Sequence, residues 1–173
     1  MFALRDGPDT GTALLPLENG MTLVRSTSSL SKGEWVRARG ERVWRVAFPG
    51  AHDQVRRARA LVRTLLAGTG CEDDAALVVT ELANNALQHT RSGVEGGWFG
   101  VEVVANDARV LVSVTDQGAG GELVWANSGP GAEDGRGLFI VAELAASCGA
   151  RVESDGAHTV WAELGARCLG RMF

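Results

Sequence analysis

The chain contains no tyrosine and almost no lysine, so its basic residues are nearly all arginine. It also lacks a long apolar run, and no stretch approaches the roughly 20 residues that a membrane-spanning helix needs. The N-terminus lacks a basic region followed by an apolar one, as a signal peptide would have. The net charge of −4 gives no general attraction to nucleic acid or to anionic membranes. We therefore expect a cytoplasmic protein that contacts neither nucleic acid nor membranes directly.

Metal-binding and redox patterns are also missing. The three cysteines are widely spaced and form no Cys-x-x-Cys pair, and the three histidines do not complete a metal-binding set. The cysteines are therefore expected to be buried or incidental thiols in a reducing compartment: Cys71, Cys148 and Cys168.

Two common phosphate-binding motifs are absent. No Gly-x-x-x-x-Gly-Lys-[Ser/Thr] sequence occurs, which excludes a P-loop protein. The Gly-x-Gly pairs at 118–120 and 135–137 have Leu123 and Ile140 where a dinucleotide fingerprint needs its third glycine. Any nucleotide site must therefore be built in another way.

At 173 residues, one domain is the default, with room for a real hydrophobic core. Residues 1–40 are interrupted by proline, glycine and serine, and are expected to be an N-terminal extension with at most a short strand over Met21 to Val24. The folded domain is expected over 41–165, followed by a C-terminal tail over 166–173.

Hydrophobic periodicity predicts the elements of this domain. Alternation predicts strands over 42–48, 98–105, 109–115, 151–153 and 159–164, of which the last four form two hairpins. Helical spacing predicts a basic amphipathic helix over 53–67, a second over about 73–90, and a third that opens at 135–137 and closes at Cys148-Gly149. Sequential hairpins favour an α/β (α+β) two-layer sandwich, with about three helices on one face of a mixed, mostly antiparallel sheet.

A polar stripe runs along the second predicted helix. Glu81, Asn85 and His89 recur every four residues and lie on one side of a helix. The apolar residues of the same segment fall on the other side, toward a core: Ala75, Val79, Leu82, Ala83, Ala86 and Leu87. Such a stripe is usually a solvated face, but Glu81 can serve as a general base and Asn85 offers an amide oxygen suited to Mg²⁺.

Two glycine motifs follow the stripe in the chain. Asp116-x-Gly118-x-Gly120 ends a predicted strand, where a buried carboxylate could accept a hydrogen bond from an exocyclic amine such as that of adenine. Gly135-Arg136-Gly137 opens a helix, whose free N–H groups favour phosphate, and Arg136 could add charge-assisted contacts. Each motif alone is more often an ordinary turn or helix start.

Taken in order, the three motifs resemble the N, G1 and G2 boxes of the ATPase superfamily of gyrase, the heat-shock chaperone, histidine kinases and mismatch repair proteins, the Bergerat fold. The matching patterns are Glu81-(x)3-Asn85-(x)3-His89, Asp116-x-Gly118-x-Gly120 and Gly135-x-Gly137-Leu138. Their compact spacing resembles the anti-sigma factor serine/threonine kinase branch, as do Phe48-Pro49-Gly50 and Thr159-Val160-Trp161. The resemblance covers about residues 41–165.

This resemblance implies a role for each matching residue. Glu81 would be the catalytic base, Asn85 would hold Mg²⁺, and Asp116 would bind the adenine of ATP. Gly118, Gly120, Gly135, Arg136, Gly137 and Leu138 would surround the nucleotide; His89 would lie near it, and Thr159 would support the adenine pocket. The implied partners are an anti-anti-sigma factor-like protein and a sigma factor, and the resemblance allows a homodimer.

One departure keeps alternatives open. Sporulation-type members carry an arginine just before the G2 glycines, whereas this chain has Glu133 and Asp134 there and places Arg136 between the glycines. A non-catalytic nucleotide- or sigma-binding module is therefore an alternative to the kinase. The ATP-binding part of a histidine kinase is a weaker one, since His52-Asp53 is only a faint phospho-acceptor pattern and no dimerising helical hairpin precedes the fold.

Overall fold

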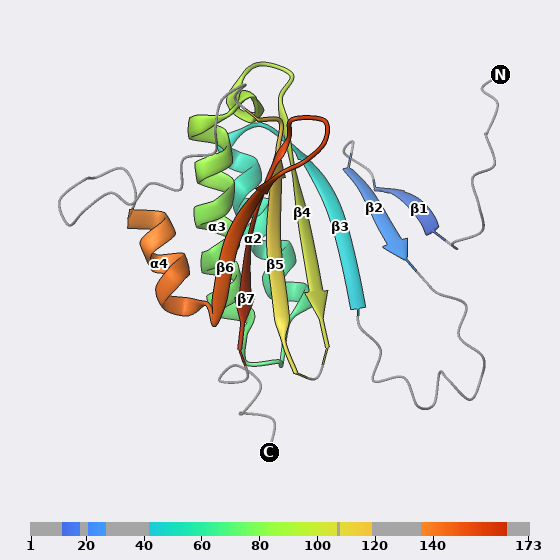
Figure 1. Ribbon diagram of the computed structural model, residues 1–173. Coiled ribbons are helices and arrows are strands. Elements are labelled where there is room, and N and C mark those ends of the chain that lie inside the picture. Colours follow the sequence, from blue (N-terminus) through green and yellow to red (C-terminus); the bar gives the residue numbers. More distant parts are fainter. Residues whose placement is uncertain (1–11, 18–20, 27–41, 107, 119–135, 166–173) are drawn as a thin grey trace.

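The computed structural model describes residues 12–17, 21–26, 42–106, 108–118 and 136–165, which form a sheet with helices packed on one face (Figure 1). The elements in chain order are β1 (Thr12–Leu17), β2 (Met21–Ser26), β3 (Arg42–Pro49), α2 (His52–Leu65), α3 (Glu72–His89), the short 3-10 helix η1 (Arg91–Gly93), β4 (Trp98–Ala105), β5 (Val110–Asp116), α4 (Arg136–Leu144), β6 (Ser147–Val152) and β7 (His158–Leu164).

The seven strands lie in the order β1-β2-β3-β4-β5-β7-β6, and each neighbouring pair in this sheet is antiparallel. The last strand, β7, lies between β5 and β6, so its register is set on both sides. In the pairing of β5 with β7, Asp116 at the end of β5 lies directly opposite His158 at the start of β7. The predicted two-layer α/β sandwich is confirmed.

The helix layer covers one face of the sheet because α2 and α3 each bury an apolar side (Figure 1). The apolar residues predicted for the buried side of α3 are all buried: Ala75, Val79, Leu82, Ala83, Ala86 and Leu87. The four arginines predicted for the outside of α2 are all exposed: Arg56, Arg57, Arg59 and Arg63. α4 packs beside α3 and reaches β6 and β7.

The end of the third helix differs from the prediction. α4 ends at Leu144, and Cys148-Gly149 belongs to β6, which begins earlier than the predicted strand over 151–153. Gly149 therefore lies in a strand, where glycine leaves room for the neighbouring ring: a Cβ at this position would come within 2.8 Å of the Trp161 ring on β7.

The short strand expected over Met21 to Val24 is confirmed as part of β2. None of the helices among the described residues is long and apolar enough to span a membrane.

A stacked aromatic pair fixes β3 against β4 beneath the helices. Phe48 and Phe99 are cross-strand partners, both fully buried, and their ring centroids are 5.4 Å apart.

We expect Phe99→Ala to lower the free energy of unfolding by about 3–5 kcal/mol, since it removes buried apolar area and leaves a cavity. Urea denaturation measures this change. Phe139→Ala, at an exposed position of α4, is the control and should change stability by less than about 0.5 kcal/mol; equal losses would contradict the assignment of Phe99 to the core.

Candidate functional site

The acidic residue of the α3 stripe meets the opening of α4. Glu81 and Asn85 are half-buried, whereas His89 is exposed near the end of the helix. A Cβ on Gly137, the second residue of α4, would lie only 2.6 Å from Oε2 of Glu81. Glycine at 137 therefore lets the α4 backbone approach the Glu81 carboxylate, and the structure brings together two residues that are 56 positions apart in the chain, at 81 and 137.

The carboxylate of Asp116 lies at the buried end of β5, on the side of the sheet that the helices cover. Its residue is 3% exposed, and Oδ1 accepts a hydrogen bond from the Gly118 N–H at 2.6 Å. Burial raises the pKa of Asp116, while the Gly118 N–H, the charge of His158 and the Thr90 side chain act in the opposite direction. A buried, hydrogen-bonded acceptor of this kind is suited to bind an N–H donor of a ligand.

The turn after Asp116 is clamped by the chain that follows α3. The Arg91 N–H donates to the Gly118 carbonyl at 2.9 Å, and the Arg91 guanidinium donates to the Gln117 carbonyl at 2.9 and 3.2 Å. The buried Ser92 hydroxyl accepts the Gln117 N–H at 3.0 Å. α3 thus carries Glu81 and Asn85 along its length and leads directly into the residues that hold the Asp116 turn.

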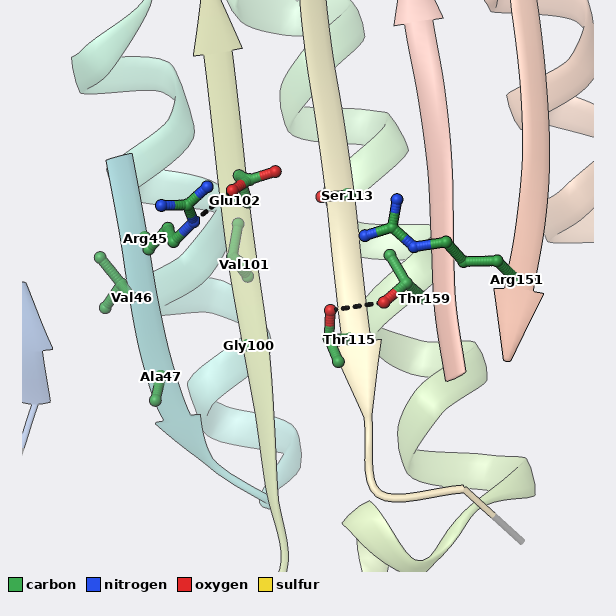
Figure 2. Close-up of a pocket in the computed structure, with 10 residues that line it drawn as sticks. All are labelled: Arg45, Val46, Ala47, Gly100, Val101, Glu102, Ser113, Thr115, Arg151 and Thr159. Carbon is green, nitrogen blue, oxygen red and sulfur yellow. Dashed lines mark hydrogen bonds and ion pairs between the residues drawn. The ribbon is translucent and has the colours of Figure 1, made fainter. Parts of the chain in front are cut away.

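Thr159, predicted to support the adenine pocket, is not brought to Asp116. Its side chain lies on the face of the sheet away from the helices, where its hydroxyl is hydrogen-bonded to Thr115 at 2.9 Å (Figure 2). The same hydroxyl also donates to the Glu153 carboxylate at 2.7 Å. Both threonines line a hollow of about 410 Å³ on that face, together with Arg45, Glu102 and Arg151. The resemblance gave Thr159 its role, and strand alternation sends its side chain to the other face.

The residue of β7 that faces Asp116 is His158, which the sequence analysis missed. His158 is buried, and its Nδ1 lies 3.7 Å from Oδ1 of Asp116. The sequence held a signal for it, since Val160, Ala162 and Leu164 mark the even-numbered positions of this strand as the core side. Arg91 and Ser92 were also missed, and no local pattern indicates their contacts, which join segments far apart in the chain.

Several predicted site residues lie outside what the structure describes. Gly120 and Gly135 are among them, as are Glu133 and Asp134, and of Arg136 only the backbone at the start of α4 is described. Leu138 is buried on α4. Among the described residues, no group of three or more His, Cys, Asp or Glu side chains could hold a metal ion.

The Asp116 turn depends on glycine at 118. Gly118 has φ +66°, and a Cβ there would overlap the carbonyl oxygen of Gly156. Gly68 is a matched control, because it has φ +80° with open space around it. We expect Gly68→Ala to lower the free energy of unfolding by about 1–2 kcal/mol through backbone strain alone. Gly118→Ala should lower it by about 1–3 kcal/mol more than Gly68→Ala does, because the backbone must also move away from Gly156. Thermal or urea unfolding of both variants tests this, and equal losses would show that the contact with Gly156 does not matter.

Comparisons with known proteins identify the family of the chain. A search of curated proteins found no match. The family described as the histidine kinase-like ATPase domain matches residues 48–163, which is more than half of the chain and runs from the end of β3 into β7. A domain of this type implies ATP binding. On this match, the chain belongs to the histidine kinase-like ATPase domain family.

Proposed function

We propose that this protein is a cytoplasmic, Mg-ATP-dependent serine/threonine kinase of the anti-sigma type. It would phosphorylate a small anti-anti-sigma factor-like protein and bind a sigma factor, with a homodimer as its working form. The observation that carries the proposal is the contact between Glu81 on α3 and Gly137 at the opening of α4. This contact supports a base at Glu81 beside a phosphate-binding helix start, and the burial of Asp116 supports a purine acceptor there.

At the purine end, an ionised Asp116 can accept a hydrogen bond from the exocyclic amine of adenine. One of its oxygens already accepts the Gly118 N–H, which fixes the plane of the carboxylate. The clamp formed by Arg91 and Ser92 keeps Gln117 and Gly118 in place, so the carboxylate is positioned before the ligand arrives.

At the phosphate end, the first turn of α4 supplies backbone N–H groups and the positive end of the helix dipole. Glycine at 137 lets the Glu81 carboxylate lie against this first turn. Asn85, on the same stripe as Glu81, would hold Mg²⁺ through its amide oxygen, with phosphate oxygens and waters as the remaining ligands. The donor set fits, since a single neutral oxygen is sufficient for an ion shared with phosphates. Bound Mg²⁺ would neutralise charge on the phosphates.

Glu81 would act as the base. The serine or threonine hydroxyl of the partner attacks the γ-phosphorus, its proton passes to the Glu81 carboxylate, and the bond from the γ-phosphorus to the bridging oxygen breaks to release ADP. Because Oε2 of Glu81 lies so close to the α4 backbone at Gly137, the carboxylate is held beside the position where the phosphates would bind.

The second candidate function is a nucleotide- or sigma-binding module with little turnover. It is motivated by the sequence, which has Glu133 and Asp134 where sporulation-type kinases carry an arginine before the G2 glycines. An acidic pair in place of that arginine would supply no positive charge to stabilise the transferring group. Partner binding without ATP consumption would support this alternative over the kinase.

The base assignment is tested by Glu81→Gln, which keeps the size of the side chain and removes its basicity. We expect transfer of the γ-phosphate from labelled ATP to a serine-bearing antagonist protein to fall by about 10²–10⁴-fold, the usual contribution of a general base. ATP affinity should change only severalfold, because the base acts on the hydroxyl. Glu143→Gln, at an exposed position of α4, is the control. Transfer that survives in Glu81→Gln would remove Glu81 from the mechanism.

The purine assignment is tested by Asp116→Asn. Burial raises the pKa of Asp116, so the fold favours its protonated form, and the stability that this residue contributes declines as the pH rises through that raised pKa. A neutral asparagine should therefore leave the melting temperature at pH 7 unchanged or higher, while ATP affinity drops at least about tenfold. Asp73→Asn, on the exposed start of α3, is the control. Unchanged ATP affinity in Asp116→Asn, measured by calorimetry, would count against the whole site.

A further inference from the structure

We propose that His158 is a positioning and specificity-determining residue of the purine subsite: its imidazole orients the Asp116 carboxylate and keeps it an acceptor, so that adenine is bound and guanine is rejected. The inference rests on the proposed nucleotide-binding function and adds to it a residue that acts through Asp116.

The geometry places the imidazole along the whole Asp116 turn. His158 and Asp116 are cross-strand partners on β7 and β5, and both lie on the helix-covered face of the sheet. Nδ1 of His158 is 3.7 Å from Oδ1 of Asp116. On the other side of the ring, Nε2 lies 3.6 Å from the position that a Cβ on Gly118 would take. The ring thus lies against both the carboxylate and the glycine turn, which the Gly118 N–H joins to each other, and it limits how either can move.

The charge state of Asp116 decides what it can recognise. An ionised carboxylate only accepts hydrogen bonds, whereas a protonated one also donates. Adenine presents an amine donor at the position where guanine presents a carbonyl acceptor, so an ionised Asp116 favours adenine and a protonated one loses that preference. Burial is the largest influence on Asp116 and raises its pKa, toward the form that does not discriminate.

Among the described residues around Asp116, His158 is the ionisable side chain whose charge opposes this effect of burial. The other influences that lower the pKa are hydrogen bonds from the backbone at Gly118 and at His158 and from the Thr90 side chain at the end of α3. Backbone donors survive any substitution at 158. The imidazole is therefore the one part of this environment that a change at 158 removes, and its loss should raise the pKa of Asp116 further.

Two variants at position 158 and two control variants test whether the imidazole orients Asp116, keeps it an acceptor, or does both. His158→Ala removes the imidazole altogether, whereas His158→Asn keeps an amide N–H close to the place of Nδ1 but cannot become charged. His52→Ala is the matched control, an exposed histidine at the start of α2, and Asp116→Asn reports on the proposed function itself. The dissociation constants of ADP and GDP are measured by calorimetry from pH 5 to pH 8, with thermal melts to show that each variant is folded.

ADP binding by the wild type should weaken as the pH falls through the pKa of Asp116. We expect His158→Ala to bind ADP about tenfold more weakly at pH 7, to lose part of its preference for ADP over GDP, and to weaken at a higher pH than the wild type. His158→Asn should recover most of the ADP affinity at pH 8, where orientation suffices, but keep the shifted pH profile. A merely structural role for His158 would lower affinity without moving that profile.

The inference is overturned if both His158 variants keep the wild-type affinity, selectivity and pH profile while Asp116→Asn loses ADP binding. If Asp116→Asn itself binds ADP as the wild type does, the proposed purine site fails, and the inference fails with it. Should His158→Ala not fold, the pH profile of His158→Asn decides: a shift supports the inference, and an unshifted profile contradicts it.

Discussion

A buried carboxylate constrains this structure more than any other single group. Asp116 lies under the helix layer, where an ion is costly unless polar groups surround it. The Gly118 N–H, the His158 imidazole and the end of α3 meet there. Each of these contacts also fixes a segment: the turn after β5, the start of β7, and the chain that leaves α3. The proposed purine subsite is thus a junction of three elements around one buried carboxylate.

The same helix links this junction to the opposite end of the site. α3 presents Glu81 and Asn85 along one side, and the chain after it supplies Arg91 and Ser92 to the Asp116 turn. A rigid helix fixes the distance between the groups that it carries or leads into, so the proposed purine acceptor and the candidate base are held at a set separation. Gly137 completes the arrangement from α4, since any larger residue would push against the Glu81 carboxylate.

The two faces of the sheet have different chemistry, although the same strands form both. On the covered face, Asp116 and His158 stand among aliphatic side chains. On the open face, the hydroxyls of Thr115 and Thr159 are hydrogen-bonded to each other (Figure 2). Thr159 and Arg151 both donate hydrogen bonds to Glu153. Neighbouring side chains of a strand point to opposite faces of the sheet, so a role assigned to the wrong one of two neighbours falls on the wrong face. Thr159 points to the open face, whereas His158 beside it points to the covered face.

The sequence alone was sufficient to predict the sandwich, the buried side of α3, the exposed arginines of α2 and the strand pairs, because these depend on local periodicity. It also indicated Glu81, Asn85 and Asp116 as candidates, through motif order and a family resemblance. Only the tertiary structure decided that Cys148-Gly149 lies in β6, that Glu81 meets Gly137, and that Arg91 and Ser92 hold the Asp116 turn. Periodicity shows which face of an element is buried, whereas contacts between distant segments depend on strand register and on how closely two backbones approach.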